Sequence, residues 1–263
     1  MMNWLACEPA ARLGDDPERL EQLRTAAAGL RSTIRIFEAY LPKAWGKLRR
    51  RLKSVQRLIA AVRDLDFALR DLEDFAIQQG EAGRLALQIL RQRTVTDLAV
   101  AREKMLKAID KASTQRLMGR LITQLSGAPL AGGDSENLPA SAFASALIGK
   151  RYEELRPNPR RVARLREAIG AFEYFYGEAA QEMERTLGKL EELLSSLEAV
   201  EFAGGRIQSC VVGETTLSAT AFLLGIYFEQ LRARAAKLRQ RVPKSIAKVQ
   251  GRRWKALRES MAR

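Results

Sequence analysis

The stretch LKSVQRLIAAVRDLDFALRDL, residues 52–72, decides the fold of this chain. Its apolar residues stand three or four positions apart, as they do on one face of an α-helix. That face comprises Leu48, Leu52, Val55, Leu58, Ile59 and Val62. The pattern predicts a helix that begins near Ala44. It fits either a continuation or a bend into residues 65–79, and Gly80 predicts the end.

The same spacing returns along most of the chain, so we predict an all-α fold with long helices. Asp16 and Pro17 form a helix start, and Pro42 ends the helix that follows. Further helices are predicted at residues 81–126 (as one helix or two), 142–155, 159–177, 178–200 and 217–241. The stretch 202–216 is predicted as a loop. Pro243 is predicted to interrupt the last long helix.

Composition divides the chain near its middle. The stretch GAPLAGGDSENLPAS, residues 127–141, is rich in Gly, Pro, Ser and Asp and lacks periodicity, which predicts a linker. It separates an N-terminal half, 17–126, from a C-terminal half, 142–242, and residues 243–263 are predicted as a basic tail. Each half contains a pair of helices of similar spacing, which is a weak sign of internal symmetry.

The residue types present exclude several classes of function. The chain has no histidine, which excludes a His-based catalytic triad, a His general base and His metal ligands. Cys7 and Cys210 are isolated and predict two reduced packing cysteines. No Gly-rich phosphate loop is present. We therefore predict a protein that is not an enzyme and has no cofactor and no metal site.

The chain shows no membrane signal. Its longest apolar run is too short for a membrane span, and its N-terminus lacks the pattern of a secretory signal. The expected compartment is the cytoplasm. The carboxylates of the stretch 178–198 predict a solvated or ion-paired face in preference to a di-metal site, because no Glu-x-x-His motif is possible.

Positive charge is clustered in the sequence. The net charge is +14, and Arg232–Arg263 alone holds twelve Lys or Arg against one acid, giving +11. A second run, Lys43–Lys53, has six cations and no acid. Such clusters are typical of proteins with a polyanionic partner, and a solubilising tail is the alternative for the C-terminal one.

Three arginines of the first helix, Arg24, Arg31 and Arg35, fall within about 40° of one another on a helical wheel. They form a stripe beside the apolar face. Arg31 has no acid three or four positions away, whereas Glu21 can reach Arg24. Guanidinium groups this close repel unless an anion, or acids from another helix, neutralise them.

The second helix adds three charged residues. Arg51, Arg63 and Asp66 lie near its apolar face, where charges must be paired or must line a polar groove. The segment Arg63–Asp66 is able to supply one such pair. An ion pair that fixes helix packing and a binding role are both compatible with this pattern.

The stretches EQLRTAAAGLRSTIRIFEAYLP, residues 21–42, and 52–72 with its RDLD segment resemble the opening signature of the CHAD family, the conserved-histidine α-helical domain. The likeness is weaker after the linker and returns in the basic, Trp-containing C-terminus. The resemblance implies two pseudo-symmetric helical bundles of the four-helix type. It also implies a non-catalytic module whose basic groove binds inorganic polyphosphate and which associates with polyphosphate granules.

Carried onto this chain, the resemblance and the charge clusters predict one set of polyanion-binding residues: Arg24, Arg31, Arg35, Lys47, Arg50, Arg51, Arg63, Arg166, Lys244, Lys248, Arg252 and Arg253. The chain departs from the family pattern at Glu21 and Pro159, which stand where the family has histidines, and at Ala28 and Gly29, where it has arginines. Two alternatives stay open. One is a scaffold or protein-interaction module with a degenerate anion site, and the other is a nucleic-acid-binding protein that uses the basic C-terminus.

Overall fold

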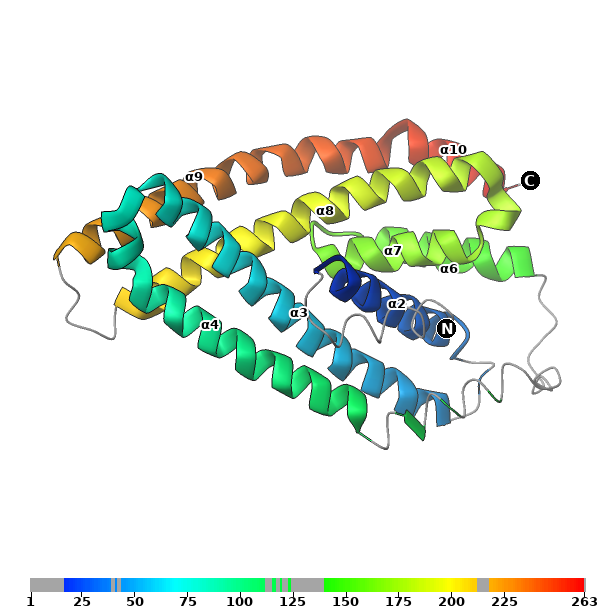
Figure 1. Cartoon of the computed structure of the whole chain (residues 1–263). Coiled ribbons are helices and arrows are strands. Elements are labelled where there is room, and N and C mark those ends of the chain that lie inside the picture. Colours follow the sequence, from blue (N-terminus) through cyan, green and yellow to red (C-terminus); the bar gives the residue numbers. More distant parts are fainter. Residues whose placement is uncertain are drawn as a thin grey trace. The chain divides into compact units, whose positions relative to one another are not determined.

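The computed structural model of the chain is built of helices (Figure 1). The structure describes residues 17–38, 41, 44–111, 115–116, 119, 123, 140–211 and 218–262. Within these ranges there is no β-strand, so the prediction of an all-α fold is confirmed. The chain forms two compact units, Met1–Ser135 and Glu136–Arg263, and each is described by itself below.

The first unit is organised around one long helix. Helix α3 (Ala44–Gln78) packs against α2 (Pro17–Ile36) and against α4 (Gly80–Asp110). The pattern left open whether α3 continues or bends after residue 62, and the structure shows one continuous helix of 35 residues. Gly80 has a φ of 72°, a conformation that glycine adopts without strain, and it lets the chain turn from α3 into α4.

The core of the first unit uses the apolar faces that the sequence indicated. Buried residues from all three helices meet in one cluster, which includes Leu23, Ala27 and Ile34 of α2, Leu52, Val55 and Ile59 of α3, and Leu98, Met105 and Ile109 of α4. Arg51 was expected close to this buried face, but it is exposed. Its position is at the edge of the apolar stripe, and its long side chain extends from there into solvent.

The second unit contains α6 (Ala140–Glu153), α7 (Pro159–Ala171), α8 (Glu173–Val211), α9 (Ser218–Lys248), the π-helical turn η2 (Val249–Arg253) and α10 (Trp254–Met261). Its core includes fully buried Leu165 of α7 and Leu187 of α8. The side chain of Asn158 accepts a hydrogen bond from the backbone N–H of Arg160 and so caps α7, with Pro159 in the first turn.

The structure of the second unit differs from the sequence prediction at two expected breaks between helices. The stretch 202–216 was predicted as a loop, but residues 202–211 continue α8, and Ala203 and Ile207 are buried. Packing of this segment outweighs its two glycines, and Gly204 lies against Phe228 of α9. Residues 212–217 lie outside the described ranges. So do residues 127–139 of the predicted linker, whereas Ala140 and Ser141 belong to α6.

The C-terminal segment is folded, so the prediction of a tail that begins at Pro243 is wrong. Helix α9 continues through Pro243, which is exposed, as far as Lys248. The helical path changes instead at Gly251, where ψ is −136°, and α10 follows. Val249 and Leu257 are fully buried. These two apolar anchors hold the segment against the second unit and outweigh the loss of one backbone donor at the proline.

Candidate functional site

The arginine stripe of α2 lies at the boundary between core and solvent. Arg24, Arg31 and Arg35 are each half-buried. They flank the buried positions Leu23, Ala27 and Ile34. Arg35 also donates a hydrogen bond to Ser32 Oγ at 3.3 Å. The stems of these side chains therefore pack beside apolar surface, and Arg35 is held deepest, since its Nε is buried.

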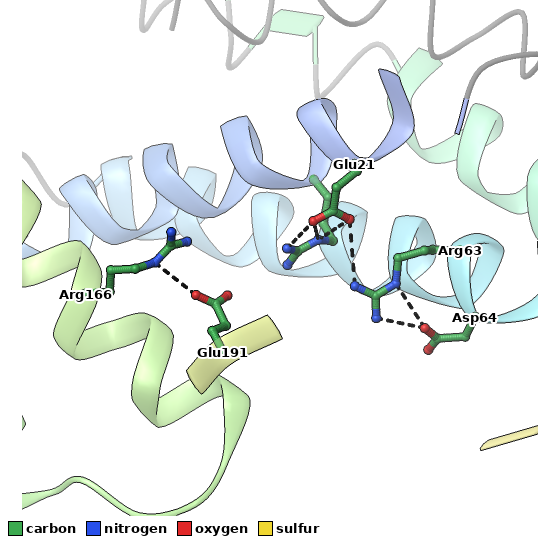
Figure 2. A network of polar contacts seen from close by, with 6 residues as sticks. Glu21, Arg63, Asp64, Arg166 and Glu191 are labelled. Carbon is green, nitrogen blue, oxygen red and sulfur yellow. Dashed lines mark hydrogen bonds and ion pairs between the residues drawn. The ribbon is translucent and has the colours of Figure 1, made fainter. Parts of the chain in front are cut away.

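A carboxylate holds one end of this stripe. Glu21 accepts hydrogen bonds from Arg24 Nε at 2.9 Å to each of its two oxygens. Arg63 Nη1, from α3, lies 3.8 Å from Glu21 Oε2. Figure 2 shows Glu21 facing Arg63, which reaches on to Asp64. We call Glu21, Arg24, Arg63 and Asp64 the Glu21 cluster.

The RDLD segment supplies the ion pair that its composition suggested, but between neighbouring residues. Arg63 Nη2 lies 2.8 Å from Asp64 Oδ1. Asp66 instead pairs with Arg70, one turn further along α3, at 2.5 Å. Arg63 is thus held by two carboxylates, one from α2 and one from α3. The cluster ties the two helices together and also brings two arginines to one place.

The basic run of α3 remains open to solvent. Lys47, Arg50 and Arg51 are all exposed, and none contacts an acid among the residues that the structure describes. Lys43 lies outside the described residues. Cations in the first turns of a helix oppose its macrodipole, and α3 has no acid in its first turn to compensate. This end of α3 is therefore favourable for an anion.

In the second unit, Arg166 of α7 is engaged by an acid of α8. Its Nε lies 3.0 Å from Glu191 Oε2, and the Glu191 side chain is only 13% exposed. Both atoms are buried and lack hydrogen-bond geometry, so the contact is an ion pair between closely apposed charges. Figure 2 also shows this pair. Arg166 is consequently less available to a ligand than the exposed cations of α3.

Three of the four predicted C-terminal cations, Lys248, Arg252 and Arg253, lie on a groove. A hollow of about 720 Å³ between α8 and the α9–α10 segment is lined by Glu178, Ala179, Glu182, Ala247, Lys248, Gly251, Arg252, Arg253 and Ala256. Arg253 Nε donates to Glu182 Oε1 at 2.7 Å. Lys244 is exposed and is not among the lining residues. The sequence did not reveal this groove, although the helical spacing of Glu178 and Glu182 placed both acids on one face of α8.

An aromatic pair adjoins this groove. Trp254, which follows Arg253, stacks on Tyr152 of α6 with ring centroids 3.6 Å apart and ring planes 3° apart. Burial raises the pKa of Tyr152, and the positive charge of Arg258 opposes this shift. Just past the end of α6, a hydrogen bond from Arg151 lowers the pKa of Glu154. The end of α6 is therefore fixed by stacking and by a local ion pair.

Two further properties of the described residues bear on function. They contain no group of three or more His, Cys, Asp or Glu side chains arranged to hold a metal ion. Among the same residues, no helix has the length and apolar character required to cross a membrane.

The predicted site residues fall into three groups. These are the α2 stripe with the Glu21 cluster and the start of α3, the Arg166–Glu191 pair, and the C-terminal cations.

Comparison with known proteins identifies the class of this all-helical, cation-bearing chain. The family model described as the CHAD domain matches residues 2–164. The chain therefore belongs to the CHAD family, and the resemblance noted in its sequence is confirmed. No match was found among curated proteins.

Two solved structures share the fold. PptA from Streptomyces chartreusis has a TM-score of 0.66 at 16% sequence identity, over 93% of this chain and 94% of that one. The crystal structure of the CHAD domain from the plant Ricinus communis has a TM-score of 0.65 at 22% identity, over 92% of this chain and 86% of that one. At these identities the likeness concerns the fold alone.

Proposed function

We propose that this protein is a non-catalytic binding module for inorganic polyphosphate. The observation that carries the proposal is the gathering of half-buried arginines along α2, where Arg24 is joined by Arg63 of α3. Planar guanidinium groups bind phosphate oxygens through paired hydrogen bonds. Membership of the CHAD family, for which polyphosphate binding is the expected activity, supports the same ligand.

The remaining cations extend the proposed contact area. Lys47, Arg50 and Arg51 add exposed positive charge at the start of α3. In the second unit, the proposed contacts are Arg166 and the C-terminal group Lys244, Lys248, Arg252 and Arg253. A linear polyanion that contacts many such groups releases counterions, and its affinity then falls steeply with salt.

The test is a salt titration of binding to long-chain polyphosphate, with duplex DNA and RNA as competitors. Combined Arg24→Gln, Arg31→Gln and Arg35→Gln substitutions are expected to weaken binding at least tenfold. They should also reduce the slope of log K against log salt by about 0.7 for each lost contact, by analogy with single-stranded nucleic acids. A matched control replaces three exposed cations elsewhere in the first unit, Arg57, Arg84 and Lys104, by glutamine.

Each of the other outcomes identifies an alternative function. Equal or tighter binding of nucleic acid would assign the protein to nucleic-acid binding. Loss of binding only on combined substitution of Lys244, Lys248, Arg252 and Arg253 by glutamine, which keeps buried Val249 and Leu257, would make the α2 stripe structural and the C-terminal cations the binding group. Absence of binding to any polyanion would favour a scaffold in which Glu21 and Asp64 neutralise a degenerate site.

Binding to polyphosphate also predicts where the protein is found in a cell that stores this polymer. A fluorescently tagged chain is expected at polyphosphate granules, and the triple arginine variant is expected to be diffuse. Equal granule association of the two forms would contradict the proposed role of α2.

A further inference from the structure

The groove between α8 and the α9–α10 segment has the size of a small-molecule site. Its volume of about 720 Å³ falls within the range of about 300–1,000 Å³ that is usual for such sites. Small residues, Ala179, Ala247, Gly251 and Ala256, contribute much of its lining. Charged residues from three consecutive segments surround it, so the groove combines open space with a definite electrostatic character.

The cations reach the groove from both sides of a change in backbone direction. The chain departs from helical geometry at Gly251, where ψ is −136°. Lys248 lines the groove before this point, and Arg252 and Arg253 line it after this point. Lys255, in contrast, is not among the lining residues, and its side chain is 72% exposed.

The charges in the groove are only partly compensated. Glu182 is shared by Arg253, at 2.7 Å, and by Arg185, at 3.2 Å. Lys248 and Arg252 contact no acid among the residues that the structure describes, and both are exposed. Glu178 likewise contacts no cation there. Two cations are therefore available for a ligand, and a third, Arg253, can exchange its carboxylate for one.

We propose that this groove binds a short phosphate chain, either an inorganic oligophosphate or the phosphates of a nucleotide. Its three cations match a ligand of about three phosphates, which charge-assisted hydrogen bonds would hold. Glu178 and Glu182 repel an anion that extends along α8, which favours a short ligand over a long polymer. The inference rests on the proposed function, which also takes phosphate as the ligand group and counts Lys248, Arg252 and Arg253 among its contacts.

The experiment records the fluorine NMR signal of Trp254, which adjoins Arg253. Tripolyphosphate is added to the full chain at constant ionic strength. Labelling with 5-fluorotryptophan places a probe on each of the three tryptophans, and Trp254→Phe identifies the third signal. We expect a saturable shift of the Trp254 signal. Lys248→Gln with Arg252→Gln should weaken this binding at least about tenfold, because two charged contacts are lost.

Two further variants separate a site from general attraction. Lys237→Gln with Arg241→Gln removes the same charge from exposed positions of α9 outside the groove and should change the affinity less than twofold. Glu178→Gln removes a repelling carboxylate that holds no cation among the described residues, and binding should become about threefold to fivefold tighter. A gain of affinity cannot result from misfolding.

The inference is overturned if the Trp254 signal does not titrate, or if the α9 control weakens binding as much as the groove variant does. ATP in place of tripolyphosphate distinguishes the source: similar affinities indicate the phosphate chain alone, and tighter binding of ATP indicates a nucleotide. The α2 triple arginine variant should leave the Trp254 titration unchanged. Failure of polyphosphate binding at α2 and failure of the groove are therefore observed separately.

Discussion

Replacing Glu21 by glutamine is expected to tighten polyphosphate binding. The Glu21 carboxylate receives two hydrogen bonds of 2.9 Å from Arg24 Nε and lies 3.8 Å from Arg63 Nη1. A phosphate that approached the same guanidinium groups would have to displace this carboxylate or lie beside it. Glutamine keeps the size of the side chain and removes its charge, so this carboxylate no longer competes with phosphate for Arg24 and Arg63, although Asp64 still contacts Arg63.

The magnitude follows from the geometry of the Glu21 cluster. Two unit charges at about 4 Å repel by about 1 kcal/mol in water and by about 4 kcal/mol at an effective dielectric constant of about 20. The side chain of Glu21 is 43% exposed and that of Arg24 is 24% exposed, so a value near the lower limit applies. A gain of about 1–2 kcal/mol corresponds to roughly fivefold to thirtyfold tighter binding.

The assay is a binding titration of wild type and Glu21→Gln with long-chain polyphosphate at several salt concentrations. The slope against log salt should steepen by about 0.7 for each additional contact between a guanidinium and phosphate. Glu73→Gln is the matched control, because Glu73 is also half-exposed and pairs with an arginine, Arg91, at 2.9 Å in the same unit. Loss of the exposed ion pair should cost only about 0.2–1 kcal/mol of stability. Unchanged or weaker binding by Glu21→Gln would refute the reasoning.

Three other substitutions test the second unit. Gly177→Ala should lower the free energy of unfolding by about 1–3 kcal/mol in a denaturant titration, because φ of 53° and ψ of −133° strain any other residue. Burial raises the pKa of Tyr152 above its ordinary value of 10.0. The neutral phenol therefore contributes to the stability of the folded chain below pH 10, and this contribution is lost as pH rises through the raised pKa. Tyr152→Phe should therefore flatten the fall of Tm in alkaline solution. Arg166→Gln should lower Tm while changing polyphosphate affinity less than Arg24→Gln does, and the opposite ranking would show that Arg166 contacts the ligand.

Much of the first unit was predictable because its signals are local. Apolar spacing placed α2 and α3, and the same helical geometry placed the three arginines beside Leu23, Ala27 and Ile34. The contact of Glu21 with Arg24 spans three positions of one helix, and so it was predictable too. The contact with Arg63 was not, because it depends on how α2 and α3 pack.

The C-terminal segment was less predictable because tertiary packing decides its structure. Pro243 was interpreted as a stop, yet Val249 and Leu257 are fully buried and hold the continuing helix in place. The groove depends on a pair between Glu182 and Arg253, which stand 71 positions apart. No local pattern contains this pair, and the change in backbone direction at η2 has no sequence signal beyond Gly251.

The Arg24–Glu21 and Arg166–Glu191 pairs differ in the exposure of the carboxylate that loses its partner when phosphate binds the arginine. When phosphate takes Arg24, the carboxylate of Glu21 can turn into water, because 43% of that side chain is already exposed. When phosphate takes Arg166, the carboxylate of Glu191, only 13% exposed, loses its partner in a largely buried place. A buried charge without a partner is costly, so this second exchange is unfavourable. An arginine at a family position is therefore available to an anion only in proportion to the exposure of the acid that holds it. By this criterion we expect the α2 stripe and the Glu21 cluster to contribute more than Arg166 to the proposed binding of polyphosphate.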